Sequence, residues 1–207
     1  MKKGLFITLE GIEGAGKSTV VDFIEDFLTK EGHDVIKTRE PGGTVIGEQI
    51  REILLKNENY TLTYDTELLL VFSARAQHIQ EVILPALSSG KTILCDRFTD
   101  ASYAYQGGGR GIDASRINLL EKWVQGDLRP NLTLLFDLDV SIGMQRTKKR
   151  SGTDRFEREE INFFEKIRNT YLERAKNEPQ RFRIINSASS LENVKEQIVT
   201  ILKDFLC

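Results

Sequence analysis

The sequence predicts an α/β fold in three layers, with a five-stranded parallel sheet covered by helices on both faces. Two observations predict it. Short apolar stretches alternate with amphipathic helical stretches along the chain, which is the pattern of a parallel sheet built from βαβ units. A Gly-rich loop, residues 11–18, joins the first apolar stretch to the first helical one, where a phosphate-binding loop would lie.

Five short apolar stretches are expected to form the strands: residues 5–9, 35–38, 92–96, 132–138 and 181–185. The first helix should begin near Gly16 and end at Gly32, because apolar residues recur at helical spacing up to Leu28 and glycine commonly ends a helix. The remaining helices are expected over residues 66–87, 157–176 and 191–206. Pro85 should kink or split the first of these three, because proline removes an interior hydrogen bond.

The composition of the 207 residues is that of one globular domain, residues 1–207, with 40% hydrophobic and 29% charged residues. The apolar runs are too short to cross a bilayer and no cleavable apolar segment follows Met1, so we expect a cytoplasmic protein that does not enter the membrane. The net charge of −2 argues against a nucleic-acid polymer as the main partner. Cys95 and Cys207 are too few for a disulfide framework.

Residues 11–18 read Gly-Ile-Glu-Gly-Ala-Gly-Lys-Ser and meet the pattern GxxxxGK[ST]. The glycines let backbone N–H groups face a phosphate, Lys17 can reach the terminal phosphates, and the hydroxyl of Ser18 can hold Mg²⁺. The helix that begins near Gly16 adds the positive end of its dipole. The loop therefore predicts a site for a nucleoside triphosphate.

Charged residues also follow the later strands, at the edge where open α/β sheets bind their ligands. Residues 39–43 (Arg-Glu-Pro-Gly-Gly) follow the second strand, Asp96 and Arg97 end the third, and Asp139 follows the fourth. Guanidinium groups beside a phosphate loop suit the recognition of a second phosphate. Asp96 is expected to hold Mg²⁺ or its water shell opposite Ser18, and the alternative is a helix cap or a surface salt bridge.

Basic residues crowd residues 146–158, around a break at Ser151-Gly152-Thr153. A glycine-containing turn between helices suits a lid that closes over phosphates, supplies arginine and excludes water from competing with an acceptor. The alternative is a solvated helix face. The basic residues are Arg146, Lys148, Lys149, Arg150, Arg155 and Arg158.

Six segments together resemble the thymidylate kinase family, and the resemblance spans nearly the whole chain. The resemblance implies a P-loop kinase fold and transfer of the γ-phosphoryl group of ATP, with Mg²⁺, to dTMP, which gives dTDP on the way to dTTP. It also implies a homodimer, formed through the long helices that include residues 66–87. The segments are residues 6–18, 38–43 (Thr-Arg-Glu-Pro-Gly-Gly), 74–78 (Ala-Arg-Ala-Gln-His), 96–98, 104–107 and 154–157.

The resemblance further implies a role for each matching residue. In dTMP, the phosphate would be held by Arg39 and Arg97, the thymine ring by Arg75, and the deoxyribose by packing on Tyr105. Another edge of the thymine would face Ser102 and Gln106, and the 3′-hydroxyl would lie near Glu13. ATP would be bound by Gly11, Ile12, Glu13, Gly14, Ala15, Gly16, Lys17, Ser18 and Thr19.

Two positions set this sequence apart within the resemblance. The phosphate loop has no arginine. In addition to Lys17 and Arg97, we therefore expect Arg150 or Arg155 in the lid to supply positive charge that stabilises the transferred group.

The family usually has a base-stacking aromatic residue four positions before the thymine-reading arginine, and that position is Val71 here, with Phe72 next to it. Either Phe72 stacks on the base, since spacings of three and four share a helix face, or Phe72 packs in the core and Val71 forms an apolar wall.

Two other functions compete with this interpretation. A kinase for another monophosphate or a nucleoside would share the loop, the lid and the chemistry, and would differ in its acceptor pocket. A GTP-hydrolysing switch would also use the loop, but such proteins carry an NKxD element, which does not occur after the fourth predicted strand.

Overall fold

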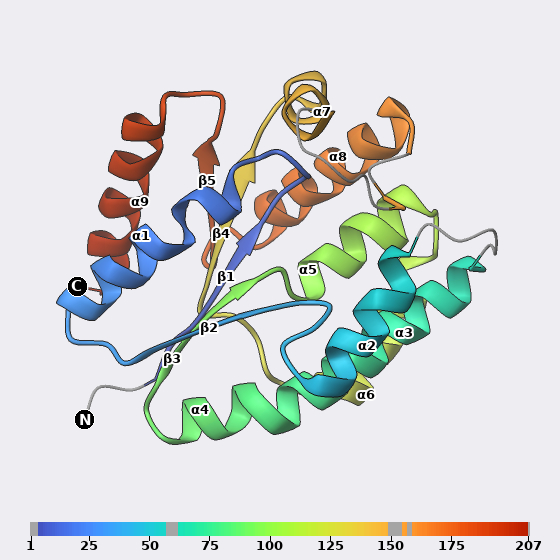
Figure 1. Ribbon diagram of the computed structural model, residues 1–207, viewed down its shortest axis with the longest axis horizontal. Coiled ribbons are helices and arrows are strands. Elements are labelled where there is room, and N and C mark those ends of the chain that lie inside the picture. The colour runs from blue at the N-terminus through green and yellow to red at the C-terminus, as the bar shows by residue number, and fades with distance from the viewer. Residues whose placement is uncertain (1–3, 57–61, 149–154, 157–158, 207) are drawn as a thin grey trace.

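A five-stranded parallel sheet forms the centre of the computed structural model, which describes residues 4–56, 62–148, 155–156 and 159–206 (Figure 1). Its strand order is β2-β3-β1-β4-β5, with every neighbouring pair parallel. The predicted fold class is therefore confirmed. The strands are β1 (Phe6–Glu10), β2 (Val35–Arg39), β3 (Thr92–Asp96), β4 (Leu132–Asp137) and β5 (Phe182–Asn186).

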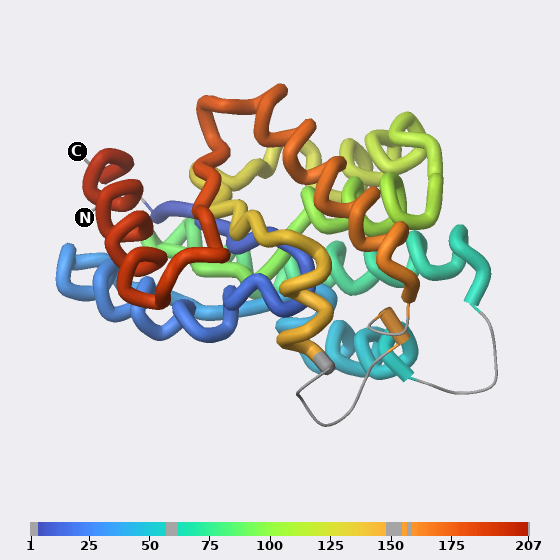
Figure 2. The backbone as a smooth tube through the Cα atoms, turned by 90° about the horizontal axis from the view of Figure 1, so that it is seen from above, coloured from blue at the N-terminus to red at the C-terminus, as the bar shows by residue number. Residues whose placement is uncertain are grey.

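Helices cover both faces of the sheet (Figures 1 and 2). Helices α1 and α9 pack against each other on one face, whereas α4 and α8 contact strands from the other. The helices on the second face also include α2, α3 and α6. The α-helices are α1 (Lys17–Lys30), α2 (Val45–Leu55), α3 (Tyr64–His78), α4 (Leu84–Ser88), α5 (Thr99–Ser102), α6 (Ala114–Gln125), α7 (Val140–Lys148), α8 (Ile161–Asn177) and α9 (Leu191–Leu206), and the π-helical segments are η1 (Ile79–Ile83) and η2 (Tyr103–Gly109).

The strand register brings the predicted functional segments to one edge of the sheet. Leu9 lies beside Asp96, and Asp96 in turn lies beside Arg39. The carboxyl ends of β1, β2 and β3 therefore lie side by side at one edge of the sheet, and the phosphate loop begins at the same edge.

The predicted helix over residues 66–87 is one continuous helical path with a π-helical turn inside it. Helix α3 ends at His78, η1 follows, and α4 has Pro85 in its first turn. Proline is tolerated in a first turn, where its missing N–H group would have no partner, and the wider π-turn before it absorbs the break. Helices α2 and α6 were not predicted, although each begins at a side-chain cap: Thr44 accepts from Gly47 N, and Asp113 accepts from Ser115 N.

Among the residues that the structure describes, no helix is both long enough and apolar enough to cross a membrane.

Candidate active site

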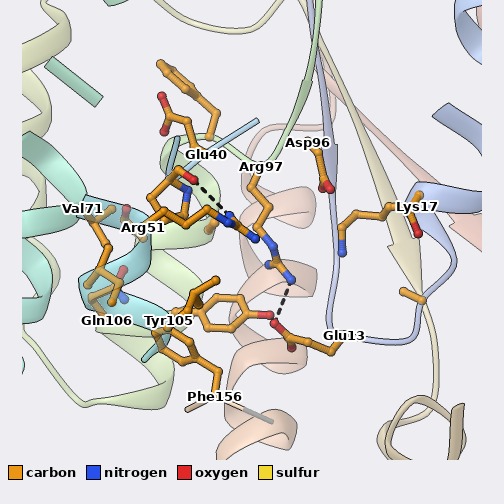
Figure 3. A pocket seen from close by; sticks show the side chains of 18 of the residues that line it. Glu13, Lys17, Glu40, Arg51, Val71, Asp96, Arg97, Tyr105, Gln106 and Phe156 are labelled. Carbon is orange, nitrogen blue, oxygen red and sulfur yellow. Dashed lines mark hydrogen bonds and ion pairs between the residues drawn. The ribbon is translucent and has the colours of Figure 1, made fainter. Parts of the chain in front are cut away.

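A cavity of about 290 Å³ opens at the carboxyl ends of β1, β2 and β3 (Figure 3). Its walls come from the phosphate loop, from α2, α3 and α5, and from η2. This volume is near the lower end of what small-molecule sites occupy. The lining residues comprise Glu13, Gly14, Ala15, Gly16, Lys17, Ser18, Glu40, Pro41, Arg51, Leu54, Leu55, Val71, Arg75, Asp96, Arg97, Phe98, Ala101, Ser102, Tyr105, Gln106, Thr147 and Phe156.

The phosphate loop adopts a conformation that only glycine accommodates at its tightest points. Gly11 has φ 137°, and a Cβ atom there would lie 2.5 Å from the carbonyl oxygen of Phe136. Gly14 has φ 74° and lies directly against the backbone of Gly143 in α7. Close packing on both sides holds the loop around the N-terminus of α1, where free N–H groups and the helix dipole attract anions.

Lys17 is the buried cation of this loop. Its Nζ atom donates to the carbonyl oxygens of Gly11 (2.9 Å) and Ile12 (3.2 Å). Burial, reinforced by the positive charge of Arg97, lowers the pKa of Lys17 to about 8. A phosphate bound beside it would stabilise the charged form.

Arg97 faces Lys17 across the cavity and has a backbone φ of 70°, which is uncommon for any residue but glycine (Figure 3). Its guanidinium donates to Glu13 Oε1 (3.0 Å) and to the Tyr171 hydroxyl (3.3 Å), and it lies 4.6 Å from the centre of the Tyr105 ring. The Tyr105 hydroxyl donates to Glu13 Oε2 (2.6 Å). These contacts fix Arg97, Tyr105 and Glu13 as one unit.

Glu10 lies behind this unit and is fully buried. It accepts from the backbone N–H of Phe98 (2.7 Å) and from the Tyr171 hydroxyl (2.7 Å). Burial, followed by the negative charge of Asp100, raises the pKa of Glu10 to about 8. The ion pair of Arg97 in this unit is the one with Glu13.

A second arginine that lines the cavity with Arg97 is Arg51, which the sequence analysis did not predict. Arg51 lines the cavity and donates to the Pro41 carbonyl (3.0 Å), whereas the predicted Arg39 is half-exposed, binds Glu48 (2.8 Å) and is not among the lining residues. Burial and then the positive charge of Arg39 lower the pKa of Arg51. Arg39 thus contributes charge from beside the cavity.

Arg75 is almost completely buried at the far end of the cavity, with 1% of its surface exposed. Its Nε atom donates to Glu40 Oε2 (2.7 Å) and its Nη2 atom to the Phe98 carbonyl (3.1 Å). Glu40 also accepts from the ring of His78 (2.9 Å). The Nη1 atom of Arg75 has no hydrogen-bond partner among the described residues, which leaves it available to a ligand.

The structure decides between the two alternatives for Phe72 and Val71. Phe72 packs in a core cluster with Leu68, and the Arg75 guanidinium lies 4.6 Å from the centre of its ring. Val71 lines the cavity and Phe72 does not. The expected stacking of Phe72 on a base is therefore wrong, because the ring lies beneath Arg75 and Val71 forms the apolar wall.

Ser102 and Gln106 line the cavity beside Arg75. The Ser102 hydroxyl is buried and has no partner among the described residues. Gln106 donates through Nε2 to Glu67 Oε1 (2.8 Å).

Asp96 and Ser18 also line the cavity, on the side of the phosphate loop. The Oδ1 atom of Asp96 is buried without a partner among the described residues, and Ser18 is exposed at the start of α1. A carboxylate and a hydroxyl are oxygen donors of the kind that Mg²⁺ takes, so these residues fit the metal.

Of the two predicted lid arginines, Arg150 lies outside the described residues. Arg155 donates through Nη2 to Glu67 Oε2 (2.6 Å) and through Nε to the Leu54 carbonyl (3.0 Å). It does not line the cavity, whereas its neighbour Phe156 does.

The phosphate loop lies across one cavity from the guanidinium groups of Arg51 and Arg97. This arrangement defines a P-loop protein with a second site for a small phosphorylated molecule. A model of the thymidylate kinase family matches residues 9–198. The thymidylate kinases of Pseudomonas syringae pv. tomato and Pseudomonas putida are 57% and 56% identical over 203 residues, which are 98% of this chain and 97% of each relative.

The crystal structure of thymidylate kinase from Ehrlichia chaffeensis is similar in fold. Its TM-score is 0.79, at 32% identity over 97% of this chain and 98% of that chain. The chain belongs to the thymidylate kinase family.

Proposed function

We propose that this enzyme transfers the γ-phosphoryl group of ATP to dTMP and releases dTDP and ADP. The observation that carries the proposal is that the phosphate loop, Arg97 and Arg51 line one shared cavity, which would place two phosphorylated nucleotides end to end. Membership in the thymidylate kinase family supports the choice of dTMP as acceptor. Both nucleotides are soluble anions of the cytoplasm, where we expect the enzyme to act.

In the ATP half, residues 11–19 would hold the phosphates through backbone N–H groups, and Lys17 would neutralise charge on the terminal phosphates. Ser18 and Asp96 would hold Mg²⁺, which when bound neutralises charge on the phosphate oxygens. The unpartnered Asp96 Oδ1 supports this assignment.

In the dTMP half, Arg97 and Arg51 would hold the phosphate, with Arg39 adding positive charge from outside the cavity. The free Nη1 atom of Arg75 suits a carbonyl oxygen of thymine, since it can only donate. Ser102 and Gln106 would meet another edge of the base. Tyr105 would pack against the deoxyribose near Glu13, where the 3′-hydroxyl would lie.

In-line transfer needs no general base here, because an ionised oxygen of dTMP is already the nucleophile. The described residues would orient the two phosphates and stabilise charge on the transferred group. We propose that residues 146–158 act as a lid and that its arginine completes this stabilisation. The contact of Arg155 with Glu67 favours Arg150 for that role.

An acceptor panel tests the proposed function. ADP formation is measured with dTMP, dUMP, dCMP, AMP and thymidine, and without an acceptor. We expect dTMP to give the highest kcat/KM and to accelerate ATP consumption. A better acceptor in the panel would reassign the enzyme to another substrate, and ADP release that ignores the acceptor would identify a nucleotide switch.

We also propose a homodimer that pairs through α3 and α6. These helices contact each other and carry large exposed apolar side chains, among them Leu69 (53% exposed), Leu119 (69%) and Trp123 (81%). Large exposed apolar side chains on neighbouring elements are a feature of protein interfaces. Sedimentation velocity should show that Trp123→Glu converts a dimer to a monomer, whereas the matched change Ile161→Glu on α8 leaves the dimer intact; a monomeric wild type contradicts the proposal.

A further inference from the structure

Glu67 is a fully buried carboxylate that lies between the base-facing end of the cavity and the C-terminal part of the predicted lid. Its Oε1 atom accepts from Gln106 Nε2 (2.8 Å). Its Oε2 atom accepts from Arg155 Nη2 (2.6 Å) and Arg110 Nε (3.2 Å). Every described side-chain group that contacts this carboxylate through a hydrogen bond is a donor, so the carboxylate acts only as an acceptor.

This arrangement determines which end of the Gln106 amide faces the cavity. A glutamine amide carries two donors on Nε2 and one acceptor oxygen, and it can rotate to present either end. Glu67 binds the Nε2 end, and rotation would place Oε1 against carboxylate oxygens. Glu67 takes one N–H of the amide and leaves Oε1 as the acceptor that Gln106 can offer to an occupant of the cavity that it lines, and Arg75 Nη1, in the same wall, offers a donor.

We propose that Glu67 is a specificity-determining residue that acts through Gln106. It holds the Gln106 amide in the orientation that accepts the N3–H of thymine and opposes the unprotonated N3 of cytosine, which is itself an acceptor. Glu67 is a positioning residue in this role, since Gln106 lies between it and the base. The inference rests on the proposed dTMP site.

The test compares dTMP with 5-methyl-dCMP. The second substrate keeps the methyl group of thymine and differs only in N3, which has no proton, and in the neighbouring exocyclic group, which is an amine in place of a carbonyl. In Glu67→Gln, the introduced side chain can donate or accept, so the Gln106 amide can rotate. We expect the ratio of kcat/KM for dTMP to that for 5-methyl-dCMP to fall about 10- to 100-fold, the size of one hydrogen bond to a charged group. Arg75 is present in both enzymes, so its own contribution to the ratio cancels.

Three further variants separate this role from a loss of packing. Arg155→Gln breaks an ion pair of the same carboxylate but leaves Gln106 in place, so the ratio should stay within about threefold of wild type. Gln106→Leu should lower the ratio as far as Glu67→Gln does. The exchanged pair Glu67→Gln with Gln106→Glu should restore it, because the carboxylate introduced at position 106 can accept both from position 67 and from N3–H.

Each outcome has a distinct meaning. If Gln106→Leu lowers the ratio and Glu67→Gln does not, the inference on Glu67 is overturned and the acceptor site stands. If Gln106→Leu changes neither the ratio nor the KM for dTMP, the acceptor site itself is misplaced. If Glu67→Gln fails to fold, the exchanged pair decides: a ratio that stays low in a folded double variant overturns the inference.

Discussion

Replacing Lys17 with methionine should stabilise the fold at neutral pH while it abolishes phosphoryl transfer. Lys17 has a pKa of about 8 in the folded state, against an ordinary value of 10.5. At pH 7 the buried charge therefore costs the unliganded enzyme about 3 kcal/mol relative to the unfolded chain. Methionine removes this cost, but it leaves the Gly11 carbonyl without its donor and the Ile12 carbonyl with the N–H of Ala15, which returns about 1–2 kcal/mol.

The pH dependence gives the sharper measurement. Because the folded pKa lies below the unfolded one, the unfolded wild type binds more protons between pH 8 and pH 10.5, and its stability rises with pH through that window relative to the variant. The stability advantage of Lys17→Met should shrink by about 2 kcal/mol between pH 7 and pH 9.5.

Urea unfolding of both proteins at the two pH values measures the difference directly, and other titrating groups cancel. A difference that is constant or grows with pH would refute the buried, partly suppressed charge. Turnover with ATP and dTMP should fall below detection in the variant at either pH, and a kcat comparable to wild type would remove Lys17 from the chemistry.

Three further predictions concern the arginines of the site and the histidine that supports Arg75 through Glu40. Arg51→Ala should raise the KM for dTMP about 10- to 100-fold in steady-state assays, because it removes a charged hydrogen-bond donor from the cavity wall; an unchanged KM would place the phosphate elsewhere. Arg150→Ala should lower kcat about 10³-fold with little change in KM, whereas Arg155→Ala should lower kcat far less; the reverse order would make Arg155 the catalytic arginine. His78→Ala should destabilise the fold by about 1–3 kcal/mol in thermal melts and raise the KM for dTMP, since Glu40 loses a partner and Arg75 loses its support. His78→Asn, which can still donate to Glu40, should recover part of the stability and part of the affinity for dTMP. An unchanged KM in His78→Ala would show that this ring does not act on base recognition.

Local patterns were sufficient to predict the centre of the sheet, because β1, β3 and β4 are short apolar runs that end in a carboxylate, and such runs are buried on both faces when strands are parallel. Helix α2 escaped notice because its apolar face is interrupted by Gly47 and its exposed face carries Val45 and Ile46. The signal that could have found it is Thr44, a capping residue three positions before the buried Gly47.

The residues of the candidate site also differ in whether local sequence or tertiary packing places them. Residues in backbone motifs, such as the phosphate loop and Arg97 at the end of β3, could be placed from sequence because strand ends converge. Arg51 could not, since it reaches the cavity from a helix that only tertiary packing brings there. The choice between Val71 and Phe72 depends on about 100° of helix rotation, which packing beneath Arg75 decides.

A common arrangement connects the groups that face the proposed acceptor. Three of them are held by a carboxylate: Arg97 by Glu13, Arg75 by Glu40, and Gln106 by Glu67. The carboxylates compensate the buried donors before any nucleotide binds, and they fix the direction in which the remaining hydrogen-bonding atoms point. Preorganisation of this kind places the ordering cost in folding, so that binding energy from the base and the phosphate is available to align the two nucleotides for transfer.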